Sequence, residues 1–322
     1  MDPSSSRHTI HDVNPFDPFR SVAYPAADLA RKTPGYEGVQ RMDLVPVAAE
    51  DRFRIDDNYD AIMQEKERLI ASTRDYVYQV TPEALVGSRQ ILSDVISAVC
   101  RRYPERFSLS NDSLQIQGRN QELRIDEGIS EPLLTLARVI QEDITLLHRD
   151  SAGMYRLAAG CVCFPSHWSL RDKMGKTVQE IHAPVPELNA RIGGKIDALL
   201  ERLSPERPMA RVNFLINFNP RLSQIPELEL LAPYRPAKVT AENIGEVLWL
   251  RNEYETLSKL PCGDIIFTLK TYQTQLKDVA PLTAKKLADM HRDLPEEYRD
   301  KYRKLSREEH ELLLAYLDTR AS

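Results

Sequence analysis

The sequence predicts an α+β fold in which helices come first and a sheet with interleaved helices follows. Two observations predict this fold. Apolar residues recur at helical spacing between Asn58 and Val80, and they alternate with polar residues between Met209 and Phe218. The sequence shows no internal repeat, and its order of elements favours α+β over a doubly wound parallel sheet.

A second helix, a hairpin and a third helix are expected in the first half of the chain. Thr81-Pro82 fits the cap and first-turn proline of the second helix. Alternating apolar residues on both sides of Gly118-Arg119-Asn120 predict the hairpin. Ser130-Glu131-Pro132 begins the third helix, whose apolar residues keep helical spacing as far as about Leu147.

The second half is predicted to be richer in strands. The apolar run from Tyr155 to Phe164 suits a buried strand. In the strand 209–218, Val212, Phe214, Ile216 and Phe218 would share the core face, and the opposite face would carry Arg211, Asn213 and Asn217. The other expected elements are helices over about 188–203 and 246–260, a strand over 265–272 and a charged helical end after residue 276.

These elements divide the chain into three parts. Residues 1–55 are rich in proline, serine and aspartate and are expected to form an extended N-terminal arm. Residues 56–275 would form the main domain, and residues 276–322 a C-terminal helical extension.

Composition narrows the class of protein. The net charge is −5, with 43 lysines and arginines scattered among 48 acidic residues, so nucleic acid is not an expected partner. No run approaches the roughly 18 apolar residues of a membrane span, and the N-terminus lacks the charged and apolar blocks of a secretion signal. We therefore expect a cytoplasmic protein without a membrane partner.

Several common enzyme motifs are absent from the sequence. It has no Gly-rich phosphate loop, no dinucleotide fingerprint and no Gly-x-Ser-x-Gly elbow. The four cysteines are too few and too irregularly spaced for a disulfide framework or a four-thiolate iron–sulfur cluster. Electrons for any redox reaction would therefore come from another protein.

The densest run of unusual residues lies between positions 161 and 186. It contains Cys161-Val-Cys-Phe-Pro-Ser-His-Trp168, then Lys173-Met-Gly-Lys176, then Ile181-His-Ala-Pro-Val-Pro186. Because proline fixes its own φ and disfavours helix at the preceding residue, we expect the His182 imidazole on a rigid extended loop. An imidazole held in this way is suited to bind a metal, although a lone histidine in a proline-rich loop is more often structural.

Other candidate residues have two interpretations each. Cys161, Cys163 and His167 could hold zinc, but two small buried thiols are the simpler account. Arg211, beside Asn213 on a polar strand face, would need an anionic partner if buried, either a haem propionate or a protein carboxylate.

Three charged residues in the predicted helix 246–260 are also ambiguous. Arg251, Glu253 and Glu255 are expected to form a solvated face. Only a carboxylate turned into a pocket could bind a substrate ammonium group or transfer protons.

Taken in order, these motifs resemble the haem-dependent oxidative N-demethylases and the related haem subunit of dimethylamine monooxygenase. The resemblance covers roughly residues 15–280. It rests on the run 161–186 and on three further motifs: Arg211-Val-Asn213, Glu253 with Thr256-Leu257, and Leu260-Pro261 before Phe267-Thr-Leu-Lys-Thr-Tyr272.

The resemblance implies a PAS-like antiparallel sheet that binds haem b, with helical additions at both ends. It also implies activation of dioxygen and oxidation of a small secondary methylamine to formaldehyde and the shorter amine. Electrons would come from a separate NAD(P)H-dependent reductase or ferredoxin. By motif position, His182 would be the axial iron ligand.

The remaining site residues also follow from motif position. Trp168, Lys173 and Arg211 would contact the cofactor, and the residues near the substrate would be Asn213, Glu253 and Tyr272. The chain departs from the family pattern at two points. Asn213-Phe214 replaces Asn-Trp, and Glu253-Tyr254-Glu255-Thr256 replaces Glu-Arg-Gln-Thr. The substrate could therefore differ from that of other members.

Two other functions remain open. The first is a non-enzymatic PAS-like haem or ligand sensor, because this fold is used mostly for sensing. The second is a scaffold or partner subunit that has lost haem, in which His182 and Arg211 would be structural.

Overall fold

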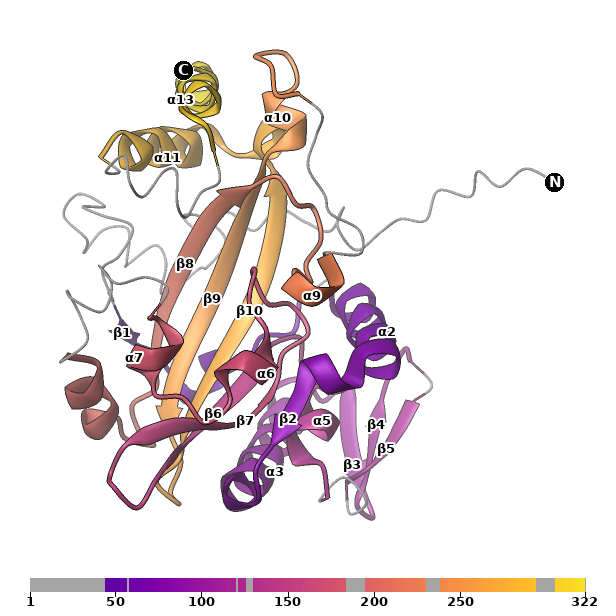
Figure 1. Cartoon of the computed structure of the whole chain (residues 1–322). Coiled ribbons are helices and arrows are strands. Elements are labelled where there is room, and N and C mark those ends of the chain that lie inside the picture. Colours follow the sequence, from indigo (N-terminus) through magenta and orange to yellow (C-terminus); the bar gives the residue numbers. More distant parts are fainter. Residues whose placement is uncertain are drawn as a thin grey trace. The chain divides into compact units, whose positions relative to one another are not determined.

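The structure is a computed structural model, and it describes residues 44–56, 58–119, 121–125, 130–183, 195–229, 238–293 and 305–321. Most of the expected N-terminal arm therefore lies outside the described residues. The chain divides into two compact units. Figure 1 labels their helices and strands. Unit 1 comprises Met1–Val45, Arg211–Tyr254 and Thr271–Ser322, and unit 2 comprises Pro46–Ala210 and Glu255–Lys270.

Strands and helices together confirm the α+β class. Seven strands form one sheet in the order β1-β8-β9-β10-β6-β7-β2, and three more form a small sheet in the order β3-β4-β5. Each pairing whose register is resolved in unit 2 is antiparallel. Among the helices that the structure describes, none is long and apolar enough to cross a membrane.

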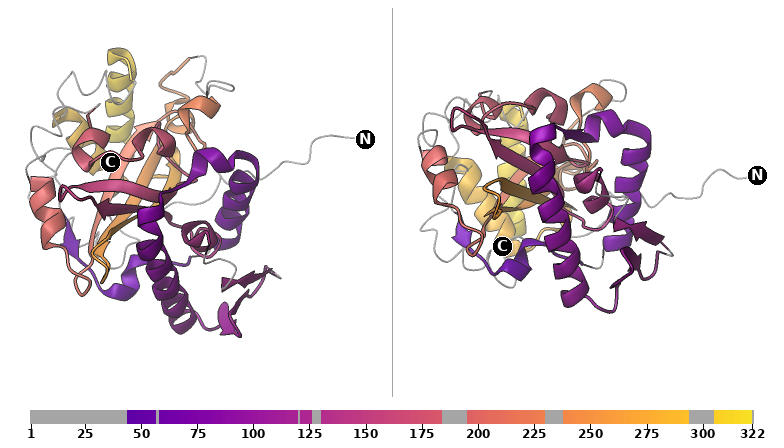
Figure 2. Two further views of the ribbon diagram at one scale, coloured as in Figure 1. Left: turned by 60° about the horizontal axis from the view of Figure 1, so that its bottom comes forward. Right: turned by 90° about the horizontal axis from the view of Figure 1, so that it is seen from below.

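Two helices of unit 2 confirm the first predictions (Figure 2). The helix α2 spans Tyr59–Val77 and buries the expected apolar stripe, but residues 78–80 leave it to form the strand β2 (Tyr78–Val80), which pairs with β7. Thr81-Pro82 opens a short 3-10 turn, η3 (Pro82–Ala84), and the helix α3 (Leu85–Arg102) follows.

The predicted hairpin is also present, with one strand more than expected. Its strands are β4 (Ser113–Ile116) and β5 (Gln121–Arg124). The additional strand β3 (Phe107–Ser110) joins β4 through Asn111-Asp112, where both residues have positive φ, as a tight two-residue turn requires.

The third helix is shorter than predicted. The helix α5 covers only Pro132–Leu136, and Asp143–Arg149 form the strand β6. This strand lies between β7 and β10 and pairs with both, and its residues Asp143, Ile144, Leu146 and Leu147 are buried without a simple alternation. Without that alternation, its apolar spacing matched a helix by coincidence.

The next elements follow the predictions more closely. The apolar run 155–164 forms the strand β7 (Tyr155–Cys161), which ends slightly earlier than expected. Two single-turn helices follow, α6 (Leu170–Lys173) and α7 (Val178–Ile181). Residues 195–202 are helical, while the start of the helix expected over 188–203 lies outside the described residues.

The helix predicted over 246–260 is wrong. Only α10 (Ile244–Val247) is helical there, and Trp249–Lys259 form the strand β9 between β8 and β10. All but the last residue of β9 are buried, so the strand lacks the alternation that would have identified it. Its neighbours are β8 (Met209–Asn217) and β10 (Ile265–Gln275).

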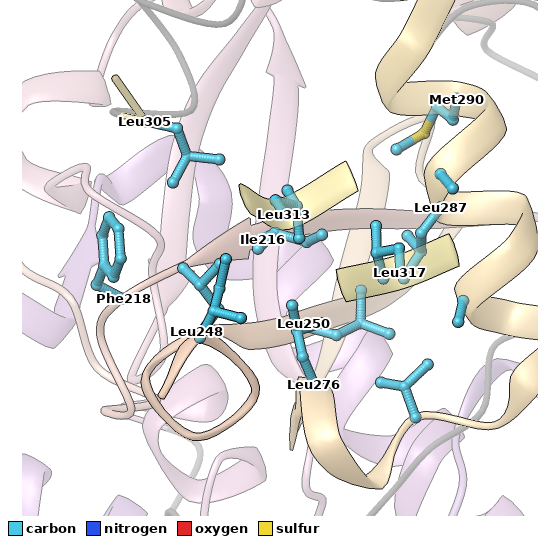
Figure 3. Close-up of a cluster of buried hydrophobic side chains, with 14 residues drawn as sticks. Ile216, Phe218, Leu248, Leu250, Leu276, Leu287, Met290, Leu305, Leu313 and Leu317 are labelled. Carbon is cyan, nitrogen blue, oxygen red and sulfur yellow. The ribbon is translucent and has the colours of Figure 1, made fainter. Parts of the chain in front are cut away.

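The helical C-terminal end is confirmed in the described part of unit 1. It contains α11 (Pro281–Asp293) and α13 (Arg307–Ala321). Both helices pack on a cluster of buried side chains from β8, β9 and the segments beside them (Figure 3). The labelled members are Ile216, Phe218, Leu248, Leu250, Leu276, Leu287, Met290, Leu305, Leu313 and Leu317. The remaining short elements are β1 (Val45–Pro46), η2 (Ala49–Arg52), α9 (Pro226–Glu229) and η4 (Leu276–Asp278).

Candidate functional site

The segment of unit 2 that carries Lys173 and His182 is fixed to the strand β7. The Leu157 N–H donates to the Lys176 carbonyl at 2.9 Å, and the Gly175 N–H donates to the Leu157 carbonyl at 2.8 Å. Gly175 has a φ of 74°, a conformation that glycine adopts without strain. These bonds place the chain at a defined position just before α7.

A capping box begins α7. The Glu180 N–H donates to the Thr177 hydroxyl, and the Glu180 carboxylate accepts a hydrogen bond from the Thr177 N–H at 2.8 Å. Arg156 of β7 contacts the same carboxylate at 3.2 Å. The hydrogen bond from the Thr177 N–H is the largest of several effects that lower the pKa of Glu180.

His182 ends this helical turn. Its backbone N–H donates to the Val178 carbonyl at 3.1 Å, and its φ and ψ are −93° and 9°. The expected extended loop is therefore wrong at His182 itself, because the capping box stabilises a helical turn up to that residue. The prolines that suggested the loop, Pro184 and Pro186, lie outside the described residues.

The His182 side chain is oriented by the same turn. Its Nδ1 lies 2.8 Å from the Val178 carbonyl oxygen. Because a carbonyl oxygen only accepts, Nδ1 carries the proton in this bond and the neutral ring has its lone pair on Nε2. Histidines that bind metals through one ring nitrogen usually donate from the other to a carbonyl or carboxylate. The half-buried His182 has this arrangement.

Lys173 supports the C-terminal end of the same turn, opposite the capping box. Its ammonium group donates to the Ile181 carbonyl at 2.9 Å, next to His182 in the chain. Burial, together with the nearby charge of Lys176, lowers the pKa of Lys173. Trp168, the third predicted residue of this segment, is half-buried in the stretch between β7 and α6.

The two cysteines of this region are buried, as the simpler interpretation predicted. A hydrogen bond with the Cys161 side chain, and then burial, raise the pKa of the Cys163 thiol. Asp143 accepts hydrogen bonds from the N–H groups of Cys163 and Phe164. No group of three or more metal-ligating side chains occurs among the described residues, so the zinc alternative gains no support.

Unit 1 contains a second group of predicted residues. The Asn213 amide donates to Oε2 of Glu253 at 3.1 Å, and Arg251 Nε donates to Oε1 of the same carboxylate at 2.9 Å. The Arg251 guanidinium also donates to the Leu222 carbonyl at 2.8 Å and to the Thr271 hydroxyl at 3.2 Å. Three strands and one loop thus meet at the pair formed by Arg251 and Glu253.

The burial of this group corrects a prediction. Arg251, Glu253 and Glu255 do not form a solvated face, because their side chains are buried in β9. Their charged character alone suggested exposure, whereas Arg251 and Glu253, apart from the bond between them, have hydrogen-bond partners 20 to 40 positions away in the chain.

Arg211 and Tyr272 take different positions relative to Glu253. Arg211 is half-buried and lies two residues before Asn213, so strand alternation places both on one face of β8. Tyr272 is buried and adjacent to Thr271, so it points to the opposite face of β10 from the one that contacts Arg251. The structure thus brings Asn213 and Glu253 together, without Tyr272.

Sequence reasoning did not single out Thr177 and Glu180, and it assigned Arg251 to a solvated face. Thr177-Val-Gln-Glu180 has the Thr-x-x-Glu pattern of a capping box, and this pattern could have located the turn before His182. Arg251 and Thr271 had no comparable pattern, because their contacts are made between strands.

Comparison with known protein families now adds a direct finding. The family model HODM_asu-like, described as haem-dependent oxidative N-demethylase, alpha subunit-like, matches residues 43–313 of the 322. The chain belongs to this family. The match confirms the resemblance found in the motifs, and the family is one of haem-dependent oxidative enzymes.

The residues of this N-demethylase family member in unit 2 fit a haem. A haem requires one protein nitrogen at the iron, and because the Nδ1–H of His182 is directed to the Val178 carbonyl, Nε2 is the ring nitrogen that would bind iron. The turn that holds His182 is in turn fixed by the capping box and by Lys173.

Proposed function

We propose that this protein is a haem-dependent oxygenase or oxidase that oxidises a small secondary amine, in which His182 would bind the iron of haem b. The hydrogen bond from the His182 Nδ1–H to the Val178 carbonyl is the observation that supports the proposal most strongly. Family membership supports the same chemistry. When bound, the haem supplies the activation of dioxygen and the storage of electrons.

We assign the other cofactor contacts by motif position. In unit 2, Trp168 would contact the cofactor, and Lys173 would either contact it or keep His182 in place through Ile181. In unit 1, Arg211 would pair with a propionate. The electrons would come from a separate NAD(P)H-dependent reductase or ferredoxin, and the words "alpha subunit" in the family description are consistent with a partner.

Glu253 and Asn213 are the proposed substrate-binding residues. A secondary amine is protonated at neutral pH, and a buried carboxylate is the side chain best suited to bind an ammonium group. Arg251 and Asn213 each donate to one Glu253 oxygen, so the carboxylate has one defined orientation. A carboxylate so oriented could hold the amine in place and accept a proton from it.

The test is amine-dependent turnover. Haem-reconstituted protein would receive electrons from a ferredoxin and its reductase with NADPH, and formaldehyde and dioxygen consumption would be measured with dimethylamine. We expect formaldehyde from the wild type, a large loss in Glu253→Gln, and little change in Glu246→Gln, an exposed glutamate of unit 1. Haem binding without amine-dependent turnover across a panel of secondary methylamines would favour the sensor instead.

A further inference from the structure

Arg251 is the most deeply buried charged side chain among the described residues of unit 1, with a relative exposure of 0%. Removing a guanidinium from water is costly unless its donors find partners. Three of its nitrogens donate to three different partners: Nε to Glu253, Nη1 to the Leu222 carbonyl and Nη2 to the Thr271 hydroxyl. Only the first of these partners carries a charge.

The loop that contributes Leu222 is itself held firmly. The Gln224 amide donates to the carbonyls of Asn219 and Arg221, and the Gln273 amide of β10 also donates to the Asn219 carbonyl at 3.1 Å. The Asn219 N–H donates to the Asn217 side chain. The Leu222 carbonyl is therefore a fixed acceptor for the guanidinium.

We infer that Arg251 is the positioning residue of the Glu253 carboxylate, and that it couples this carboxylate to the loop 217–225. A glutamate side chain has three rotatable torsions, and Asn213 restrains only one of its oxygens. The guanidinium holds the other oxygen, while its own orientation is set by the Leu222 carbonyl and by Thr271. This inference rests on the proposed function, in which Glu253 binds the amine.

A lysine at position 251 cannot reproduce these three hydrogen bonds. Its ammonium group is a compact point charge without the planar fork that reaches Glu253, Leu222 and Thr271 together. Arg251→Lys keeps the buried charge but loses the defined geometry, and a small displacement of a substrate-binding group can reduce turnover strongly. We expect a fall in kcat/KM for dimethylamine of about 10- to 100-fold.

The experiment combines kinetics with hydrogen exchange on haem-reconstituted protein. Arg251→Lys, Glu253→Gln and the double variant would be compared with Arg320→Lys. Arg320 is a suitable control because it also donates to a backbone carbonyl in unit 1, that of Val279. If Arg251→Lys does not fold, Thr271→Val takes its place as the test variant, because it removes one hydrogen-bond partner of the guanidinium and keeps the charge.

If Arg251 acts through Glu253, the double variant should be no worse than Glu253→Gln within about 2-fold, since the two residues act as one unit. Amide exchange in the loop 217–225 should be faster in Arg251→Lys than in Arg320→Lys. Additive losses in the double variant, or equal exchange in both lysine variants, would overturn the inference. A wild type without any amine turnover would instead refute the proposed function, and the exchange comparison would still decide whether Arg251 positions the loop.

Discussion

The imidazole of His182 donates a hydrogen bond from Nδ1 to the carbonyl oxygen of Val178, four residues earlier, at 2.8 Å. The same carbonyl accepts the His182 backbone N–H, so one oxygen fixes both the main chain and the ring. The ring orientation therefore depends on the integrity of a single helical turn. Residues that hold this turn should influence haem affinity even where they do not touch the cofactor.

Lys173 gives the first prediction. Lys173→Met keeps most of the side-chain length but removes the hydrogen bond to the Ile181 carbonyl. Loss of a group that orients a metal-binding histidine typically costs 10- to 100-fold in affinity, and we expect a loss of about 10-fold in haem affinity. Haem titration followed by absorbance measures it. Lys176→Met, at an exposed neighbouring position, is the control, and equal affinities in the two variants would contradict the role of Lys173.

Glu142 gives a prediction on pH. Its side chain is fully buried, and burial raises the pKa of the carboxyl group despite the attraction of Lys270 and Lys66. One oxygen accepts from the Arg54 N–H, and the other has no hydrogen-bond partner among the described residues. An acid with a raised pKa in the folded state contributes stability below its unfolded-state pKa and loses it as the pH rises through the folded-state value.

The neutral variant Glu142→Gln avoids this loss. Its free energy of unfolding should therefore increase relative to that of the wild type as the pH rises above 4.5, the ordinary pKa of a glutamate, with a limiting slope of about 1.4 kcal/mol per pH unit. Urea unfolding at several pH values measures the difference. Glu105→Gln, an exposed carboxylate in the same unit, is the matched control. A wild type that gains stability over Glu142→Gln with rising pH would show that the sign is wrong.

Leu317 tests the packing of the C-terminal helix α13. Its side chain is fully buried in the cluster that α11 and α13 share (Figure 3). Leu317→Ala should lower the free energy of unfolding by roughly 2–5 kcal/mol, because it removes buried methyl groups and leaves a cavity. Leu282→Ala in α11, where the leucine is 46% exposed, should cost less than about 0.5 kcal/mol. Similar urea midpoints for the two variants would contradict this packing.

Elements with one buried face were the ones that the sequence predicted well. The stripe that begins at Tyr59 has a polar side, so its helical period is visible in the sequence, and the alternation around Ile216 located the strand β8. The hairpin around Gly118 was equally clear, since turn residues separate two alternating runs.

Strands buried on both faces were not predictable in the same way. In β6 and β9 most residues of both faces are buried, so exposure does not alternate along the strand, and both strands were predicted as helices. Arg251 and Glu253 strengthened the error in β9, because charged residues usually face solvent. Their burial depends on Leu222, Thr271 and Asn213, which no local pattern connects to them.

The candidate site shows the same division. Motif order located His182 and the family, and the family match confirms the latter. The turn that holds His182 depends on Thr177 and Glu180, which form a Thr-x-x-Glu capping-box pattern that can be recognised in the sequence. The pairing of Asn213 with Glu253 joins two strands 40 positions apart and required the fold.

The axial role of His182 is the central claim, and an absorption spectrum tests it most directly. Haem-supplemented wild type, His182→Ala and the control His148→Ala, in which a half-exposed histidine pairs with Asp264, would be recorded oxidised, dithionite-reduced and with carbon monoxide. We predict a Soret band in the wild type and in His148→Ala that is lost or shifted in His182→Ala. An unchanged band in His182→Ala would contradict the assignment of the ligand.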